Sequence, residues 1–286
     1  MYTLTYDNIT TSGFFIAVIM VEKIYIVRHG FRMNWVMSNW KSATGLPRDP
    51  PLAALGEAQA RECASYFLSL PEDERPTAIF SSPYYRCLQT ASPVAAALGI
   101  PIFVEHGLSE WYSPVEPNTG LHPRPGPASS LEPYFPGQIS TDWDSIHYPS
   151  RLGETVDEVH VRVETFLQDF LPLRPKGERL LLVSHAATIA ALVRLLSGER
   201  DMPIRIGCCS LSQFHKKNGN TWSRVKTADG SHLSGGSLRD WGFQDIEVEN
   251  GRVVNDPGVL GSENEKNEPV GSVVGKNLNV NVTSSL

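Results

Sequence analysis

Short apolar runs along the chain mark its expected strands. The two strongest are Ile24–Val27 and Leu180–Val183, which consist of branched or large apolar residues. Shorter runs at 77–80 and 102–104 have the same character. Segments with apolar residues at helical spacing lie between these runs, so strands alternate with helices. The alternation predicts an α/β fold with a mostly parallel central sheet.

Two helices are expected in the first third of the chain. Residues 52–70 place apolar side chains on one helical face, and Pro71 ends the segment. The second helix is expected to begin with Ser82 as its N-cap and Pro83 at its first position, and to end near Leu98. The apolar face of the first helix comprises Ala60, Cys63, Ala64, Phe67 and Leu68.

Two further helices lie on either side of the second strong strand. Thr155 and Glu158 match a capping box, and apolar residues then continue at helical spacing. The other helix is predicted over 187–196. Antiparallel edge strands are expected over 206–214 and 221–225.

The segments outside these elements set the expected limits of the domain. One domain is predicted over about residues 20–255. Residues 1–19 are expected to be an optional extension, because their apolar run is too short to cross a membrane and they lack the basic residues of a signal peptide. Residues 113–150 are rich in Pro and aromatics and predict a long excursion over one end of the sheet. The polar residues 256–286 predict a disordered tail.

Composition adds limits on partners and location. The 286 residues are 41% hydrophobic and carry a net charge of −6, so there is no basic footprint for direct nucleic-acid binding, and any phosphate affinity must be local. We expect no membrane partner. The cysteines lack metal-ligand spacing and fit reduced thiols of a cytoplasmic or nuclear protein. They are Cys63, Cys87, Cys208 and Cys209.

Residues suited to phosphate chemistry follow each of the four strands. In an open α/β sheet, ligands bind at the carboxyl ends of the strands. Arginine forks match phosphate oxygens, and histidine can act as a nucleophile near neutral pH. The residues expected to meet there are Arg28, His29 and Arg32 after the first strand, Arg86 after the second, Glu110 after the third and His185 after the fourth.

Some of these residues could instead have a purely structural role. An isolated histidine at a strand end usually packs in the core, but the arginines beside His29 favour a phosphate site. Glu110 is either the general acid or an exposed loop carboxylate. Asn34 either contacts phosphate or caps its loop.

Taken together and in order, the motifs resemble the histidine phosphatase, or phosphoglycerate-mutase-like, superfamily. The resemblance covers about residues 23–215 and implies a three-layer α/β/α sandwich. It rests on Arg-His-Gly at 28–30, Pro51, Leu52, Gly56, Gln59 and Ala60 of a second motif, Ser-Pro-x-x-Arg-x-x-x-Thr at 82–90, Gly-Glu-Thr at 153–155 and His185.

The wider sequence is similar to one branch of that superfamily. Arg-His-Gly-Phe-Arg-x-Asn-Trp at 28–35, Glu-Trp-Tyr at 110–112 and Phe-Pro-Gly-x-Ile-Ser-x-x-Trp-Asp at 135–144 resemble the histidine-phosphatase subunit (tau) of the fungal RNA polymerase III factor TFIIIC and its single-domain paralogues. A more distant similarity is to protein tyrosine phosphatases of the UBASH type.

The resemblance implies a metal-independent phosphomonoester hydrolase with no cofactor. His29 would attack phosphorus and Glu110 would protonate the leaving oxygen, while the other four residues of the cluster would hold the phosphate. Glu110 must then be protonated while His29 is neutral, so the site should raise the pKa of the glutamate or work best on the acidic side. Ala186 stands where a glycine usually follows the second histidine, and its methyl group could crowd the phosphate.

Two other functions remain open at this point. The domain could be a scaffold or subunit of the polymerase III machinery, with transcription-factor subunits as partners. A phosphoglycerate-type mutase ranks last, because no residues for a sugar-acid carboxylate can be placed. The substrate, a small phosphorylated molecule or a phosphoprotein, has no identifying residue in the sequence.

Overall fold

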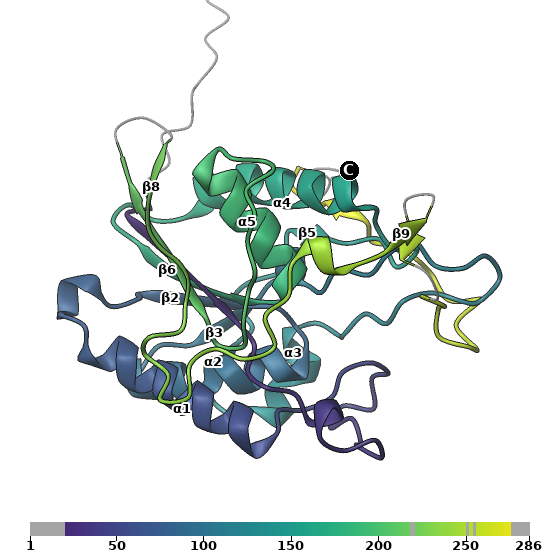
Figure 1. Cartoon of the computed structure of the whole chain (residues 1–286), viewed down its shortest axis with the longest axis horizontal. Coiled ribbons are helices and arrows are strands. Elements are labelled where there is room, and N and C mark those ends of the chain that lie inside the picture. The colour runs from purple at the N-terminus through teal and green to yellow at the C-terminus, as the bar shows by residue number, and fades with distance from the viewer. Residues whose placement is uncertain (1–20, 218–220, 250–251, 254–255, 276–286) are drawn as a thin grey trace, which may run out of the picture.

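A computed structural model describes residues 21–217, 221–249, 252–253 and 256–275. The expected N-terminal extension therefore lies outside the described residues. A seven-stranded sheet lies between two layers of helices, which confirms the three-layer α/β/α sandwich (Figure 1). Helices α1, α2 and α3 cover one face, and α4 and α5 cover the other.

The strands run in the order β4-β3-β2-β6-β1-β7-β8. The first five are parallel, while β7 and β8 are antiparallel at one edge. These strands are β1 Lys23–Arg28, β2 Ala78–Ser81, β3 Ile102–Val104, β4 Ile139–Ser140, β6 Arg179–Ser184, β7 Leu211–Lys216 and β8 Trp222–Asp229. Two-stranded pairs are formed by β5 His147–Tyr148 with β11 Gly271–Ser272 and by β9 Val248–Glu249 with β10 Arg252–Val253.

The helices agree with most of the expected boundaries. The α-helices are α1 Ala54–Ser69, α2 Tyr85–Leu98, α3 Ala128–Leu131, α4 Val156–Phe170 and α5 Ala186–Ser197. Short 3-10 helices are Met33–Trp35, Glu72–Glu74, His106–Leu108, Glu132–Tyr134, Leu171–Leu173 and Phe243–Asp245. The predicted capping box is present, since the Thr155 hydroxyl accepts from Glu158 N–H and the Glu158 carboxylate accepts from Thr155 N–H.

Strand β1 is buried on both faces, as the continuous apolar run predicts. Ile24 and Ile26 pack with α4 and α5, whereas Tyr25 and Val27 pack with α1 and α2. Its parallel neighbour β6 is also apolar, and the two strands stay in register to their last residues. The residues that follow them in the chain therefore leave the sheet side by side.

Two expectations on the helices are wrong. Leu68 is 45% exposed and does not belong to the buried face of α1. Ser82 is not the N-cap of α2, because Tyr84 takes that position. The Ser82 hydroxyl instead lies 2.7 Å from His185 Nε2, so a tertiary contact takes the group that the sequence assigns to a cap.

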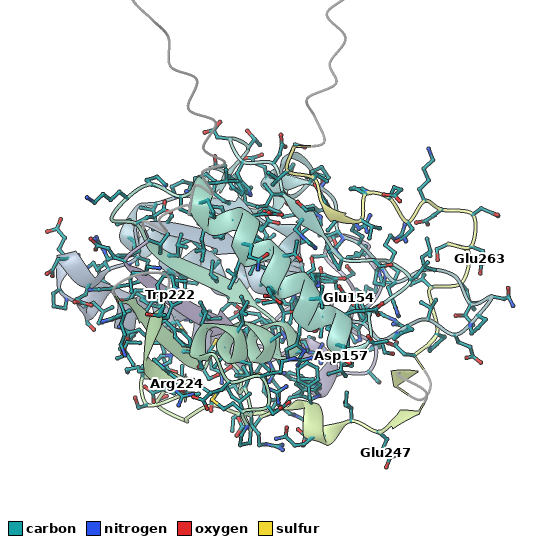
Figure 2. The ribbon with its side chains drawn as sticks, turned by 90° about the horizontal axis from the view of Figure 1, so that it is seen from above. Glu154, Asp157, Trp222, Arg224, Glu247 and Glu263 are labelled. Carbon is teal, nitrogen blue, oxygen red and sulfur yellow. The ribbon has the colours of Figure 1, made fainter. Side chains whose placement is uncertain are left out.

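The segments predicted to be irregular also contain short strands. The 113–150 excursion contributes β4 to the main sheet and β5 to a second pair. Residues 256–275 are not a disordered tail, since their β11 pairs with β5 and the Val273 N–H donates to Ile146 O at 2.9 Å. Figure 2 shows this segment along one side of the molecule, with Glu263 pointing away from the domain. The rest of the expected tail, residues 276–286, lies outside the described residues.

In the described ranges, the longest apolar helices fall short of what a membrane crossing requires.

Candidate active site

His29 follows β1 and is buried, with 1% of its surface exposed. Its backbone N–H donates to Ser184 O at 2.9 Å, which fixes it beside the end of β6. Its Nδ1 lies 2.8 Å from the Gly30 carbonyl, so Nδ1 carries the proton and Nε2 keeps its lone pair. Gly30 is required here, because a Cβ would lie 2.7 Å from Gly56 O. The motif thus delivers a neutral imidazole with a defined free nitrogen.

Burial lowers the pKa of His29 well below its ordinary value, and nearby arginines lower it further. Arg28 donates from Nη1 to the carbonyls of Ile206 and Arg239, each at 2.6 Å. Arg32 stacks on Trp35, with 4.3 Å from guanidinium to ring centroid. Burial and neighbouring arginines lower the pKa of Arg32 to about 10, so it stays cationic at neutral pH.

Arg86 is the most buried cation of the site, with 1% of its surface exposed. Its Nη1 donates to Asp49 Oδ1 at 2.9 Å, while Nη2 donates to Glu110 Oε2 and to His185 Nδ1, each at 3.1 Å. Burial opposes its charge, but Asp49 and Glu110 outweigh burial and raise the pKa of Arg86. Asp49 also accepts from the Tyr85 N–H at the start of α2 at 2.7 Å, which fixes the pair to that helix.

Sequence reasoning missed Asp49. It stands between an arginine and a proline in a loop, where an aspartate is an ordinary turn residue. The only signal for its role is the buried arginine of α2, which needs an anionic partner from somewhere in the chain.

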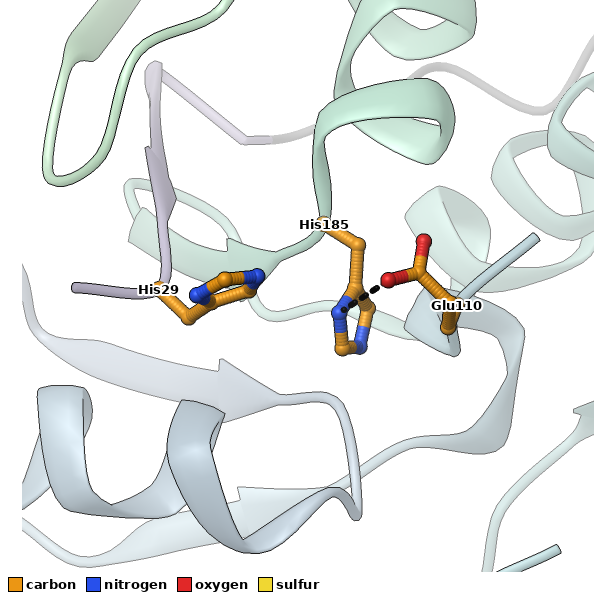
Figure 3. A group of neighbouring side chains, drawn as sticks. All are labelled: His29, Glu110 and His185. Carbon is orange, nitrogen blue, oxygen red and sulfur yellow. Dashed lines mark ion pairs between the residues drawn. The ribbon is translucent and has the colours of Figure 1, made fainter. Parts of the chain in front are cut away.

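His185 occupies the N-cap position of α5, and its side chain lies between those of His29 and Glu110 (Figure 3). Its ring lies 5.4 Å from that of His29, centroid to centroid. Its Nδ1 is 3.3 Å from Glu110 Oε2, the two atoms joined by the dashed line in Figure 3. Burial lowers the pKa of His185 to about 4, so the ring is neutral near pH 7. Because Nδ1 accepts from Arg86, Nε2 of the neutral ring carries the proton and donates to the Ser82 hydroxyl at 2.7 Å.

Glu110 follows the 3-10 helix after β3. Burial alone would raise the pKa of its carboxyl group, but the interactions with His185 and Arg86 and the nearby charge of Arg32 hold it well below its ordinary value. Of the two alternatives expected from the sequence, a raised pKa is therefore wrong, and best activity on the acidic side stays a prediction. The carboxylate occupies the donors that a phosphate would use.

A buried network fixes the loop that carries Glu110. Arg162 on α4 donates from Nε to Glu154 at 2.7 and 2.9 Å and from Nη1 to Gly107 O at 2.8 Å. The Thr188 hydroxyl on α5 donates to Ser109 O at 2.7 Å. The residues that precede Glu110 are thus held by the two helices of this layer.

The cluster opens into a cavity of about 460 Å³. Arg28, His29, Arg32, Arg86 and Glu110 line its inner end, and His185 lies behind them. Asn34 is an exposed residue of the cavity rim, and its two alternative roles remain predictions. In the described part of the chain, the Nε atoms of all three arginines are buried without a hydrogen-bond partner, which is costly unless an anion is bound there.

His29, Glu110 and His185 also have the geometry of a metal site, with ligand atoms within 4.8 Å of one another. The surrounding charge does not fit a cation. Three arginines face the same space, and the Arg86 guanidinium already donates to both Glu110 and His185. The cluster is suited to an anion instead.

A parallel-sheet sandwich with two histidines and an arginine clamp at its carboxyl edge defines the class of histidine phosphatases. A sequence profile of the histidine phosphatase superfamily (branch 1) matches residues 24–228, and the chain belongs to this family.

Individual relatives agree with this assignment. The transcription factor tau 55 kDa subunit of Saccharomyces cerevisiae is 36% identical over 260 residues, which are 78% of this chain and 59% of that protein. The chain therefore spans less than two thirds of that relative. The putative phosphoserine phosphatase 2 of Hydrogenobacter thermophilus is 28% identical over 200 residues, which are 69% of this chain and 86% of that protein.

A solved structure agrees with the fold. The ecdysone phosphate phosphatase of Bombix mori, in complex with tungstate, superimposes with a TM-score of 0.54 at 19% identity, covering 78% of this chain and 99% of that chain.

Proposed function

We propose that the protein is a metal-independent phosphomonoester hydrolase that works through a phosphohistidine on His29. The observation that carries this proposal is the neutral imidazole with a free Nε2, because His29 lines a cavity together with Arg28, Arg32 and Arg86. Arg28, Arg32 and Arg86 would neutralise the phosphoryl oxygens, with His185 completing the clamp.

The first step transfers the phosphoryl group to the enzyme. The Nε2 lone pair of His29 attacks phosphorus, and the bond between phosphorus and the leaving oxygen breaks. Glu110 gives its proton to that oxygen, so the product leaves as an alcohol. In the second step, Glu110 takes a proton from water, the resulting hydroxide attacks phosphorus, and the N–P bond breaks.

Substrate binding supplies the protonated glutamate that the first step needs. Phosphate oxygens compete with Glu110 for the N–H donors of Arg86. The loss of these donors and the nearby negative charge both raise the pKa of the carboxyl group. A substrate that enters as the monoanion also brings the proton with it.

The test is turnover of para-nitrophenyl phosphate by the purified chain, in buffer with and without EDTA. We expect turnover that EDTA does not change and that His29→Ala abolishes. His215→Ala, on β7 outside the cavity, is the matched control and should retain activity. An acid-labile, base-stable phosphoryl group on the wild-type protein would mark the intermediate. Turnover that survives in His29→Ala contradicts the proposal.

A second function is favoured by the similarity to the tau 55 kDa subunit. In this alternative, the domain is a subunit of the RNA polymerase III transcription machinery and works in the nucleus. We would mix the purified chain with transcription factor tau lacking its 55 kDa subunit and follow assembly by size-exclusion chromatography. Co-elution that His29→Ala leaves intact would support this role, and separate elution would reject it.

A further inference from the structure

The cavity extends well beyond the phosphate clamp, and its outer part is made mainly of rings and other apolar groups. Trp111 is fixed by an Nε1–H bond to Glu154 O at 2.7 Å, and its ring lies 6.3 Å from that of Trp241, centroid to centroid. Tyr112 stacks on His122 at 4.6 Å. The larger apolar and aromatic residues that line the cavity are Trp40, Pro50, Trp111, Tyr112, Trp241 and Ile246. This surface fits an uncharged, flat group.

One further cation reaches the outer cavity, and it is neutralised. Arg48 Nη1 lies 2.8 Å from Asp256 Oδ1, and its Nη2 donates to Pro257 O. The Arg48 side chain is 30% exposed and that of Asp256 is 21% exposed, and both line the cavity. Asp256 also accepts from the Ser113 N–H and hydroxyl at 3.2 and 3.0 Å. The pair therefore has a defined geometry and no net charge.

The carboxylate comes from a part of the chain beyond the family match, which ends at residue 228. The segment from Asp256 onward is held against the excursion after β3. Leu121 and Val259 form an isolated bridge, and the Leu121 N–H donates to the Ser262 hydroxyl at 2.8 Å. The position of Asp256 is thus set by backbone contacts on its C-terminal side as well as by Arg48.

We propose that Asp256 is a specificity-determining residue, which cancels the charge of Arg48 so that the enzyme takes phosphate monoesters with an uncharged, apolar leaving group. This inference rests on the proposed function, because it assumes that the phosphate lies in the inner clamp. Without the Asp256 carboxylate, Arg48 would attract a second anion on the substrate. The specificity of the pocket therefore depends on a segment outside the matched domain.

The test compares two non-hydrolysable probes, phenylphosphonate and 4-carboxyphenylphosphonate, by isothermal titration calorimetry. The wild type should bind the carboxylated probe no more tightly than the plain one. Asp256→Asn keeps the size of the side chain and an acceptor for Ser113. It should shift the ratio of the two affinities toward the carboxylated probe by about fivefold, the size of one partly exposed ion pair.

Two further variants complete the design. Glu265→Gln removes one negative charge from the same segment, where Glu265 pairs with Arg151 at 2.7 Å outside the cavity, and should leave the ratio unchanged. Adding Arg48→Gln to Asp256→Asn should return the ratio to the wild-type value. An unchanged ratio in Asp256→Asn, or an equal shift in Glu265→Gln, overturns the inference alone. Failure of both probes to bind the wild type overturns the phosphate clamp, and the inference with it.

Discussion

At the residue scale, Glu110 is the group whose behaviour differs most from the expectation. From the sequence, we expect either a glutamate with a raised pKa or a site that works best on the acidic side, and the structure surrounds the glutamate with two histidines and three arginines. Its carboxylate accepts from Arg86 and is held ionised. The proposed acid role thus requires a change of environment on binding, and two experiments address it.

Glu110→Gln keeps the size of the side chain but cannot deliver a proton. For an alkyl phosphate we expect kcat to fall by about 10²- to 10⁴-fold, the usual scale of general acid catalysis. For para-nitrophenyl phosphate, whose leaving group needs no proton, the first step should suffer much less. Hydrolysis of phospho-His29 should still be slow, so stopped-flow absorbance should show a burst of nitrophenol. Equal, modest losses on both substrates without a burst would show a structural role.

The pH profile follows from the two shifted groups. The pKa of His29 lies well below its ordinary 6.5, so the nucleophile stays neutral at pH 6.5. The fall of kcat/KM that comes from protonation of His29 should therefore occur only at a pH well below 6.5. Glu110 is ionised in the enzyme before substrate binds, so the proton must enter with the substrate. The substrate carries this proton as the monoanion, which loses it with a pKa of about 6. For an alkyl phosphate, kcat/KM should therefore decline above about pH 6. A profile that rises from pH 6 to pH 8 would contradict this assignment.

The sequence places the main members of the site but not their supports. His29, His185 and the three arginines stand next to recognisable strand and helix ends, so their meeting point follows from the order of elements. The pairing of Asp49 with Arg86 and the contact of Ser82 with His185 depend on which loops meet at the ends of the strands. No local sequence pattern indicates this arrangement. Burial and the neighbouring arginines, which set the protonation of Glu110, are likewise tertiary properties.

At the scale of elements, the start of α5 can be tested directly by a single substitution. Ala186 is the first residue of this helix, lines the cavity and is 8% exposed. Ala186→Gly removes the methyl group beside the clamp, so we expect tighter phosphate binding and a severalfold gain in kcat/KM, measured by calorimetry and steady-state kinetics. The helix should lose no more than about 1 kcal/mol of stability. Unchanged affinity would show that the methyl group does not reach the phosphate.

The elements themselves are predicted to different degrees. Buried strands and amphipathic helices have strong periodic patterns, so β1, β6, α1 and α4 follow directly from the sequence. The two-residue strands β4 and β11 do not, because segments this short have no periodicity, and they form only where a partner strand is already present.

At the scale of the whole molecule, the proposed clamp links ligand binding to stability. Phosphate or orthovanadate that binds the folded state alone should raise the free energy of unfolding by about 2.7 kcal/mol at 100 times its Kd. Differential scanning fluorimetry against ligand concentration measures this as a rising Tm. Arg86→Ala should remove the dependence, while Arg224→Ala on β8, far along the sheet from the clamp, should retain it. A flat response in the wild type would favour the subunit function.

The ionised Glu110 in the clamp also bears on which solutes the protein meets in the cell. Chloride and simple carboxylates carry no more charge than the glutamate that they would have to displace from Arg86. A doubly charged oxyanion gains more from the arginines than the displaced carboxylate loses. The glutamate would therefore act as a built-in competitor against chloride and carboxylates, whereas a phosphate monoester offers either a second negative charge or, as the monoanion, the proton that neutralises the displaced carboxylate.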